Sequence, residues 1–339
     1  MMTRMLPAAA RALWTASLGL GILAILLISP RSLAARGAGL PAQSYSSGQN
    51  VWPAYEGWEK NPDGSVDLLF GYMNDNWDEE IDVPVGPENS IQPGGPDQGQ
   101  PTHFLPRRNR FIFRVRAPKG FGEKEEIVWT LTTRGKTQKA YATLRPDYLV
   151  ENIDLMSETG ALGPGVSSPE LRADKAPVVK IEGDKKRGVK VGLPLELVAH
   201  VTDDGIPRVR SQIQAIPQTT AERGANPVPA PAQGRGRNPA LNPPARVTVN
   251  KVLGLHLSWF VYRGSGSAAF EPAQTKVWED TREGANSPWA PLWVPPQLPP
   301  DGTWVVRATF SDPGTYVLRA RADDGALSAD DELTVTVTR

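Results

Sequence analysis

The stretch FSDPGTYVLRARADDGALSADDELTVTV, residues 310–337, decides the fold of this chain. Within it, TYVLRARA (315–322) and ELTVTV (332–337) alternate apolar and polar side chains, and an acidic segment lies between them. Period-two alternation is typical of half-buried β-strands, and Asp-Gly is a favoured hairpin turn. The stretch therefore predicts two antiparallel strands joined by an acidic turn.

Further strands of the same kind lie upstream. LPLELVAHV (193–201), GLHLSWFVYRG (254–264) and TWVVRATF (303–310) carry apolar side chains at alternate positions. The segment from about 207 to 246 is dense in Pro, Ala, Gly, Asn and Gln, so we expect a disordered insertion there. Because short alternating strands separated by turns are typical of β-sandwiches, we predict one such domain over 178–339.

A second set of strands precedes this domain. NPDG (61–64) separates AYEGWE from SVDLLFGYM, which predicts a hairpin. The alternation resumes in RFIFRVRA, where Phe111 and Phe113 are expected to share a face, and again over 126–144. These patterns predict a first β-sandwich domain over 51–156.

Two segments around this block are predicted to lack regular structure. GPENSIQPGGPDQGQPTHFLP (86–106) is rich in Pro and Gly, so we expect a long loop, and such loops are often functional. SETGALGPGVSSPELRADKAP (157–177) is expected to be a linker between the two domains.

The N-terminus indicates export. A basic start is followed by the uncharged run WTASLGLGILAILLIS (14–29) and then by SLA, which is the order of a secretory signal. We predict a signal peptide over 1–34 and a flexible leader over 35–50, hence a periplasmic or extracellular mature chain. The run is slightly shorter than the ~20 residues of a spanning helix, so an uncleaved anchor is the alternative.

Composition excludes several classes of function. The chain has no cysteine, so disulfide frameworks, thiolate metal sites and thiol nucleophiles are excluded. It has 37 basic and 37 acidic residues, so no overall field favours nucleic acid or an anionic membrane. HExxH, GxSxG and phosphate-binding glycine loops are absent from the sequence. We therefore predict that the protein is not an enzyme.

The C-terminal block resembles the immunoglobulin-like domains. DPGTY (312–316) followed by Leu318 is similar to their Asp-x-Gly-x-Tyr-x-Cys corner, with Leu318 in place of the cysteine. Trp259 resembles the buried tryptophan of strand C, and Leu197 or Ala199 takes the other cysteine position. The resemblance implies that the Tyr316 hydroxyl bonds to the chain upstream.

Within that fold, the tail is similar to polycystic-kidney-disease-type and cadherin-like modules of exported bacterial proteins. The first block resembles an uncharacterised exported bacterial family, and no activity comes with that resemblance. The prediction for the whole chain is an all-β protein with two immunoglobulin-like β-sandwich domains preceded by a signal segment.

Two Asp-Asp-Gly triplets are candidates for a calcium site. Asp203 and Asp204 follow one predicted strand, and Asp323 and Asp324 follow another. In the immunoglobulin-like fold both loops lie at the same end of the sandwich, and calcium is bound by six to eight oxygens. The alternative, which we favour, is two hairpin turns whose Asp side chains bond their own backbone. No cofactor is expected, and calcium is the one alternative.

A basic segment is the first candidate for partner binding. HFLPRRNRFIFRVRAPK (103–119) carries His103, Arg107, Arg108 and Arg110. It could bind an anionic polymer or the acidic face of a partner. Pairing within the chain, with the acidic segment MNDNWDEEID (73–82), is the alternative.

Tryptophans in a proline-rich segment are the second candidate. Trp278, Trp289 and Trp293 lie close together in the sequence. Amphipathic aromatics suit a carbohydrate surface or a docking strip, but they equally well seal a core. We predict a non-catalytic interaction or structural module of the cell envelope. Its expected partner is another envelope protein or a cell-wall polysaccharide, and no nucleic acid is expected.

Overall fold

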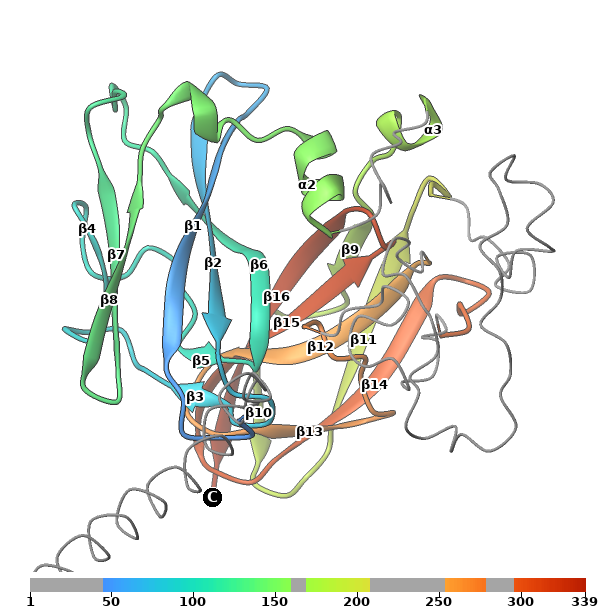
Figure 1. Cartoon of the computed structure of the whole chain (residues 1–339). Coiled ribbons are helices and arrows are strands. Elements are labelled where there is room, and N and C mark those ends of the chain that lie inside the picture. The colour runs from blue at the N-terminus through green and yellow to red at the C-terminus, as the bar shows by residue number, and fades with distance from the viewer. Residues whose placement is uncertain (1–44, 160–168, 208–253, 279–295) are drawn as a thin grey trace, which may run out of the picture. The chain divides into compact units, whose positions relative to one another are not determined.

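The C-terminal strands form the hairpin that the sequence predicts. The computed structural model describes residues 45–159, 169–207, 254–278 and 296–339 (Figure 1). Strands β15 (Gly314–Asp323) and β16 (Ser328–Thr338) pair antiparallel, with Tyr316 opposite Val335 and Leu318 opposite Leu333. Their inward side chains are buried, so the alternation in the sequence is the alternation between core and solvent.

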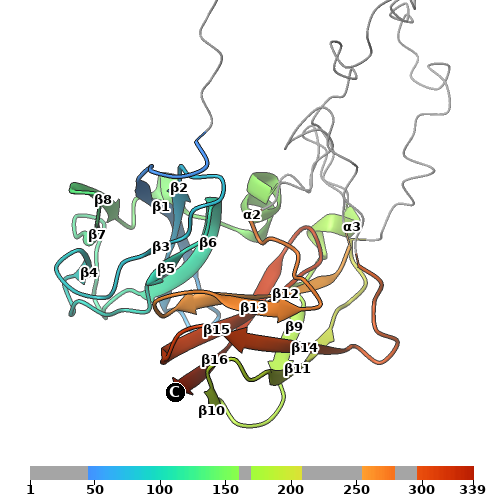
Figure 2. The same cartoon turned by 90° about the horizontal axis from the view of Figure 1, so that it is seen from below.

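Two four-stranded sheets enclose the core to which this hairpin contributes (Figure 2). The first contains, in order, β10 (Lys186–Lys190), β16, β15 and β12 (His256–Arg263). The second contains, in order, β13 (Ala268–Glu271), β14 (Thr303–Phe310), β11 (Leu195–Thr202) and β9 (Val178–Ile181). The buried side chains between them come from both sheets, which is the arrangement of a β-sandwich.

The corner before β15 has the hydrogen bonding that the resemblance implies. The Tyr316 hydroxyl lies 3.0 Å from the backbone oxygen of Asp312 and 3.0 Å from that of Ser265. Its ring is fully buried against Phe310, with 4.8 Å between the ring centroids. Trp259 is also buried, as the comparison with strand C implies. These contacts support an immunoglobulin-like second sandwich.

The first block is built from three smaller sheets. The hairpin around NPDG joins β1 (Val51–Lys60) to β2 (Val66–Asn74), as predicted. One sheet has the order β1, β2 and β6 (Arg107–Arg116). A second has the order β4 (Asn89–Gln92), β7 (Ile127–Thr133) and β8 (Lys136–Ala142). The third consists of β3 (Ile81–Asp82) and β5 (His103–Phe104).

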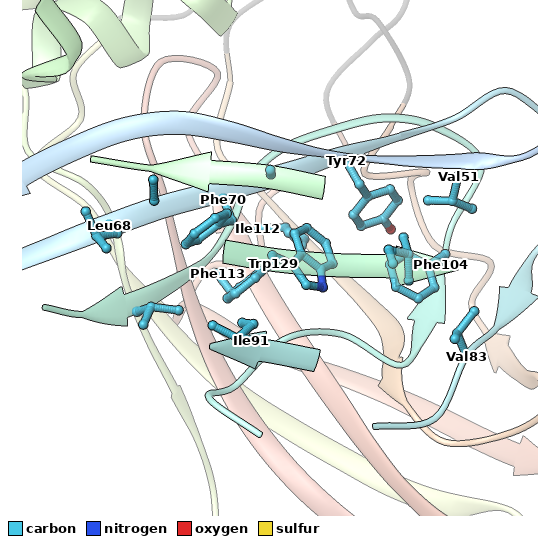
Figure 3. Close-up of a cluster of buried hydrophobic side chains, with 14 of the residues drawn as sticks. Val51, Leu68, Phe70, Tyr72, Val83, Ile91, Phe104, Ile112, Phe113 and Trp129 are labelled. Carbon is cyan, nitrogen blue, oxygen red and sulfur yellow. The ribbon is translucent and has the colours of Figure 1, made fainter. Parts of the chain in front are cut away.

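Aromatic side chains fill the core of this block (Figure 3). Trp129 lies at its centre, with Phe70 and Phe113 each edge-on to its ring and Phe104 stacked at 6.3 Å between centroids. The Trp129 indole nitrogen donates to the buried Asn89 side chain at 2.9 Å. Because the indole N–H is hydrogen-bonded, burial of the Trp129 ring stabilises the core without leaving an unpaired donor.

The prediction of which β6 side chains face the core is wrong at one position. Phe111 was expected to share the core face with Phe113, but its φ is +50° and the pairing register of β2 with β6 shifts there. Three residues of β6, 110–112, lie opposite the single residue Gly71 of β2, and Ile112 is buried in the core next to Phe113. A β-bulge of this kind cannot be read from alternation alone, because the pattern RFIF is apolar on both parities.

Segment 86–106 is not the unstructured loop that we predicted, because it contains β4 and β5. Between these two strands, amide side chains form the hydrogen bonds that a backbone ladder would otherwise form. Gln100, fully buried, donates to the backbone oxygens of Asn89 and Pro96, and Gln98 donates to that of Pro93 at 2.8 Å. Side-chain amides thus satisfy backbone groups that proline-rich sequence leaves without partners.

Two short helices lie at the predicted linker 157–177, the first of them beginning before it. They are α2 (Asn152–Thr159) and α3 (Pro169–Arg172), and a short 3-10 turn, η2 (Pro146–Tyr148), precedes them. Met156 and Leu171 pack against Ala326 and Leu327 of the β15–β16 turn. The described part of the predicted linker is therefore anchored to the second sandwich.

Strand β12 contributes to both cores. Leu257, Trp259 and Val261 belong to the core of the second sandwich, whereas Phe260 and Tyr262 pack into the core of the first block. This explains why every residue of β12 except its last is buried. Contacts group residues Tyr45–Arg339 into one compact unit. The predicted division into two domains stays a prediction.

Charged side chains reinforce the junction beside β12. The Arg319 guanidinium lies 3.4 Å from the centroid of the Tyr262 ring and donates to the backbone oxygen of Ile112 in β6. Its Nε also donates to Glu332 at 3.0 Å. Next to it, Arg321 Nε lies 2.7 Å from Asp330 Oδ1. A buried arginine of this kind is stable only because its donors are occupied.

The all-β class predicted from the sequence is confirmed by these sheets. Among the residues that the structure describes, no helix is long and apolar enough to span a membrane. The predicted signal peptide, most of the leader and nearly all of the proline-rich insertion lie outside the described residues, so they stay predictions.

Candidate functional site

One cavity brings together two residues that the sequence analysis selected separately. It has a volume of about 250 Å³, and both His103 and Trp278 line it. Most of the wall is apolar and comes from β12, β13 and the segment that follows β13. The other lining residues are Glu80, Leu105, Trp259, Phe260, Val261, Ser267, Ala268, Phe270, Ala273, Gln274, Thr275, Lys276 and Val277. Trp289 and Trp293 lie outside the described residues.

His103 is a fixed charge in the wall of this cavity. Its Nδ1 lies 2.7 Å from Asp82 Oδ1, and its Nε2 lies 3.0 Å from Glu80 Oε2. Burial alone would lower the pKa of His103, but the hydrogen bonds that the ring donates to Asp82 and Glu80 raise it to about 9. The ring is therefore an imidazolium at neutral pH, with both nitrogens occupied, and is not placed to act as a general base.

The opposite wall is formed by the segment after β13. Gln274 Oε1 accepts a hydrogen bond from the backbone nitrogen of Trp259 at 3.0 Å, and Gln274 Nε2 donates to Pro272 O at 2.6 Å. Gln274 thereby takes the place of a neighbouring strand at the edge of β12. Further along, Trp278 is half-buried, and the Lys276 ammonium lies 5.7 Å from the centroid of its ring.

The arginines of the predicted basic strip have partners within the chain. Arg107 donates to the backbone oxygen of Asp75 at 3.2 Å and stacks on Trp77. Arg108 pairs with Glu56 of β1 at 2.6 Å, and Arg110 pairs with Glu158 of α2. His103 and Arg107 thus contact the acidic segment 73–82, whereas Arg108 and Arg110 contact other elements.

The structure places the two Asp-Asp-Gly triplets in tight turns. Asp203 accepts from the Gly205 nitrogen at 2.9 Å, and Asp323 accepts from the Gly325 nitrogen at 2.6 Å. Both glycines have positive φ, which is the conformation that an Asp-Gly turn requires. The favoured alternative of backbone-bonded turns therefore describes the local geometry.

Asp174, which the sequence analysis missed, lies beside both turns. Thr202 pairs with Val178, so residues just before β9 lie next to those just after β11. Leu171 also packs against Ala326 and Leu327, which brings the same segment to the β15–β16 turn. The strand order of the second sandwich could have predicted this meeting, because the start of β9 and the end of β11 are neighbours in an antiparallel pair.

Carboxylate oxygens at this end of the sandwich lack donors. Asp174 is 4% exposed and Asp324 is 1% exposed. Among the described residues, both oxygens of Asp174, Oδ1 of Asp203 and Oδ2 of Asp324 have no well-aligned hydrogen-bond partner. Burial raises the pKa of Asp174 to about 7, with Asp204 and Asp203 adding to the shift, and burial raises the pKa of Asp324 to about 8. Uncompensated carboxylates of this kind are costly in a folded protein.

Carboxylate oxygens are suitable ligands for a hard cation, but these carboxylates lie too far apart to share one. In the described ranges, no three His, Asp or Glu side chains stand close enough to share one metal ion. Hard cations such as calcium take oxygen ligands from several loops at 2.3–2.6 Å. Binding would therefore require the turns around Asp203 and Asp324 to move toward Asp174.

Asp330 and Asp331, near the start of β16, both have partners within the chain. Asp330 pairs with Arg321 at 2.7 Å, and Asp331 accepts from the Ile181 nitrogen at 2.8 Å and pairs with Lys185. These partners lie on β15, on β9 and just before β10, so the sequence around the two aspartates gives no sign of them.

No protein-family model matches this chain, and no curated protein matches it. Among solved structures, domains 4 and 5 of the S-layer protein SbsC align with 89% of this chain and 95% of that chain, at 7% identity and a TM-score of 0.22. The D0-D1 domain of intimin aligns with 84% and 97%, at 10% identity and a TM-score of 0.22. Sidekick-1 immunoglobulin domains 1–4 align with 88% and 51%, at 9% identity and a TM-score of 0.20. Likenesses at such TM-scores carry no argument, and the function proposed below rests on this chain's own contacts.

Proposed function

We propose that this chain is a non-catalytic interaction module of the periplasm or the cell surface. The observation that carries the proposal is the cavity that gathers His103 and Trp278. Apolar walls with a few fixed polar groups are the usual composition of a binding site. The histidine in this wall is held between two carboxylates, which supports binding rather than proton transfer.

The size and composition of the cavity favour a protein partner. Sites for small organic ligands have volumes of roughly 300–1,000 Å³, and this cavity, at about 250 Å³, lies below that range. It is large enough for an anchoring side chain. Trp278 and Lys276 stand at one wall, and tryptophan is enriched among the residues that dominate the energy of protein–protein contacts. The partner is accordingly another envelope protein that inserts a side chain here.

Substitution at the cavity tests this function. Tagged wild-type protein and variants would be purified from the producing cells under mild crosslinking, and the co-purifying proteins would be quantified. We expect one partner to be retained by the wild type and by Lys139→Ala on β8, and to be reduced at least tenfold by Trp278→Ala and by Thr275→Trp. A partner retained equally by all four proteins would contradict the cavity as the binding site. Thermal melting would show that each variant is folded.

A second candidate function is a calcium-stabilised module. The observation that favours it is that, within the described part of the chain, both carboxylate oxygens of Asp174 and Oδ2 of Asp324 are buried without a well-aligned hydrogen-bond donor. Bound calcium would neutralise these charges and tie α3, the β11 end and the β15–β16 turn together, and Asp174, Asp203, Asp204, Asp323 and Asp324 are the residues that would hold it. Calcium therefore would act as a structural cation that raises the free energy of unfolding.

Thermal melting tests the calcium proposal. We expect the midpoint of the wild type to rise in calcium relative to EDTA, and the rise to fall by half or more in Asp174→Asn. Asp184→Asn, a substitution at an exposed turn aspartate of the same domain, should leave the rise unchanged. Identical midpoints of the wild type in calcium and in EDTA would exclude the calcium site.

A further inference from the structure

Three aromatic side chains remain exposed at one edge of the first block. Tyr45 is 45% exposed, and Trp52 and Trp77 are each 39% exposed. The Trp77 backbone nitrogen donates to the Tyr45 backbone oxygen at 3.0 Å, and Trp52 Nε1 donates at 2.6 Å to Oδ2 of Asp75, two residues before Trp77. We call Tyr45, Trp52 and Trp77 the aromatic platform.

Buried side chains hold the segment that carries Trp77 in a fixed conformation. Asn74 and Asn76 are both fully buried. Asn74 Nδ2 donates to the backbone oxygen of Glu79 at 2.9 Å, and Asn76 Nδ2 donates to Asn74 Oδ1 at 2.7 Å. The Gln49 nitrogen in turn donates to Asn76 Oδ1 at 2.7 Å. Two buried asparagines thus fix the turn between β2 and β3, so the exposed indole is presented in one orientation.

Arg107 supports one face of the platform and does so in an unusual conformation. Its guanidinium carbon lies 4.2 Å from the centroid of the Trp77 ring. Its backbone φ is +58°, in the left-handed region that a residue with a side chain seldom adopts. Backbone strain of this kind persists where the surroundings enforce it, and it concentrates at binding sites.

The area and chemistry of the platform suit a sugar chain. Three rings at about 40% exposure offer roughly 300 Å² in total. A stable protein–protein interface needs about 800 Å² from each partner, so the platform alone is too small for one. Pyranose rings present apolar C–H faces that stack on indole and phenol rings, and their hydroxyls can bond to the adjacent Asp75 and Asp78 side chains. The platform has carboxylates at its rim, which disfavours a polyanionic glycan.

We propose that the aromatic platform Tyr45, Trp52 and Trp77 binds a neutral polysaccharide by stacking of its sugar rings. This site is separate from the cavity at His103 and Trp278, so the module has one surface for a glycan and another for a protein. The sequence analysis placed a possible carbohydrate surface at Trp278, Trp289 and Trp293 instead. The platform carries the proposal because its rings are exposed, whereas Trp278 is half-buried and Trp289 and Trp293 lie outside the described residues.

Affinity electrophoresis in gels that contain a soluble polysaccharide tests the proposal. The probes are a β-glucan, an α-glucan, a galactomannan and, as a polyanion, polygalacturonate. We expect the wild type to be retarded by at least one neutral probe and not by polygalacturonate. The dissociation constant for that probe should rise at least tenfold in Trp52→Ala and in Trp77→Ala, and less than threefold in Trp77→Phe. Tyr141→Ala, which removes an exposed aromatic of β8, is the matched control and should bind as the wild type does.

Each other outcome contradicts the proposal. No retardation by any neutral probe, equal retardation of Trp77→Ala and Tyr141→Ala, or retardation by polygalacturonate alone would overturn it. If Trp77→Ala instead abolished capture of a protein, the platform would be a protein interface and the proposal would be wrong. A platform variant that loses the glycan but retains the partner of the cavity separates this inference from the proposed function.

Discussion

At the scale of single residues, His103 shows how neighbours decide the role of a side chain. A lone histidine before an arginine-rich strand suggested a binding residue. The structure places it between Asp82 and Glu80, which hold it protonated. The two carboxylates come from β3 and the turn before it, and only the short β3–β5 pairing brings them to the ring. The histidine therefore serves to fix one wall of the cavity.

The stability that His103 contributes should depend on pH. Its pKa in the folded chain is about 9, above the ordinary value of 6.5, so the fold gains from protonation. The gain is fully present below about pH 6.5 and is lost as the pH rises through 9. We expect His103→Asn to lower the free energy of unfolding by roughly 3 kcal/mol more at pH 6 than at pH 10.

Urea unfolding at the two pH values measures this difference. His200→Asn is the control, because His200 is exposed and its ion pair with Glu182 lies at the surface. Such pairs contribute at most about 1 kcal/mol. Equal losses for His103→Asn at pH 6 and pH 10 would show that the two carboxylates do not hold the ring as an imidazolium.

At the scale of elements, strands are where the sequence was most informative. The hairpin at NPDG, the β15–β16 pair and the buried positions of β7 follow from period-two alternation, because one face of each strand meets a core. The bulge at Phe111 did not follow, since both parities there are apolar. Strand β4 was also missed, because proline and glycine dominate its surroundings and the strand that pairs with it, β7, lies far along the chain.

The corner before β15 is the element whose stability can be tested most cleanly. Tyr316→Phe keeps the buried ring but removes the hydroxyl that bonds to Asp312 and Ser265. We expect a loss of about 1 kcal/mol in the free energy of unfolding, because the hydroxyl proton is shared in part-buried hydrogen bonds with these two carbonyl oxygens. Urea denaturation measures it, and Tyr141→Phe at an exposed position of β8 should change stability by less than about 0.5 kcal/mol. Equal effects of the two substitutions would contradict a stabilising role of the Tyr316 hydroxyl at this corner.

At the scale of the whole molecule, the candidate sites depend on contacts between residues far apart in the chain. Sequence patterns identified His103 and Trp278 individually, but not their meeting in one cavity. The same holds for Asp174, whose position beside the acidic turns depends on the pairing of β9 with β11. Alternation specifies which face of a strand is buried, whereas the pairing of distant strands determines which side chains meet.

Arg319 offers a test of the coupling between the two cores. It stacks on Tyr262 and donates to Ile112, so it connects β15 to β6 of the first block. We expect Arg319→Met to destabilise the chain by about 3 kcal/mol, because the buried Ile112 carbonyl loses its donor and the partly exposed carboxylates of Glu332 and Asp330 lose a cationic partner. Amide hydrogen exchange should increase in β6 and β12 together. Arg114→Met, at an exposed arginine of β6, is the control, and unchanged exchange in Arg319→Met would contradict the coupling.

The most direct test of the proposed function is photo-crosslinking in the producing cells, with a photoreactive amino acid in place of Lys276 beside the cavity. The account predicts one dominant protein adduct from this position, lost when Trp278→Ala is added, and no such adduct from the same amino acid at Lys139 on β8. No adduct at position 276, or the same adduct from both positions, would contradict an interaction module that binds its partner at the cavity.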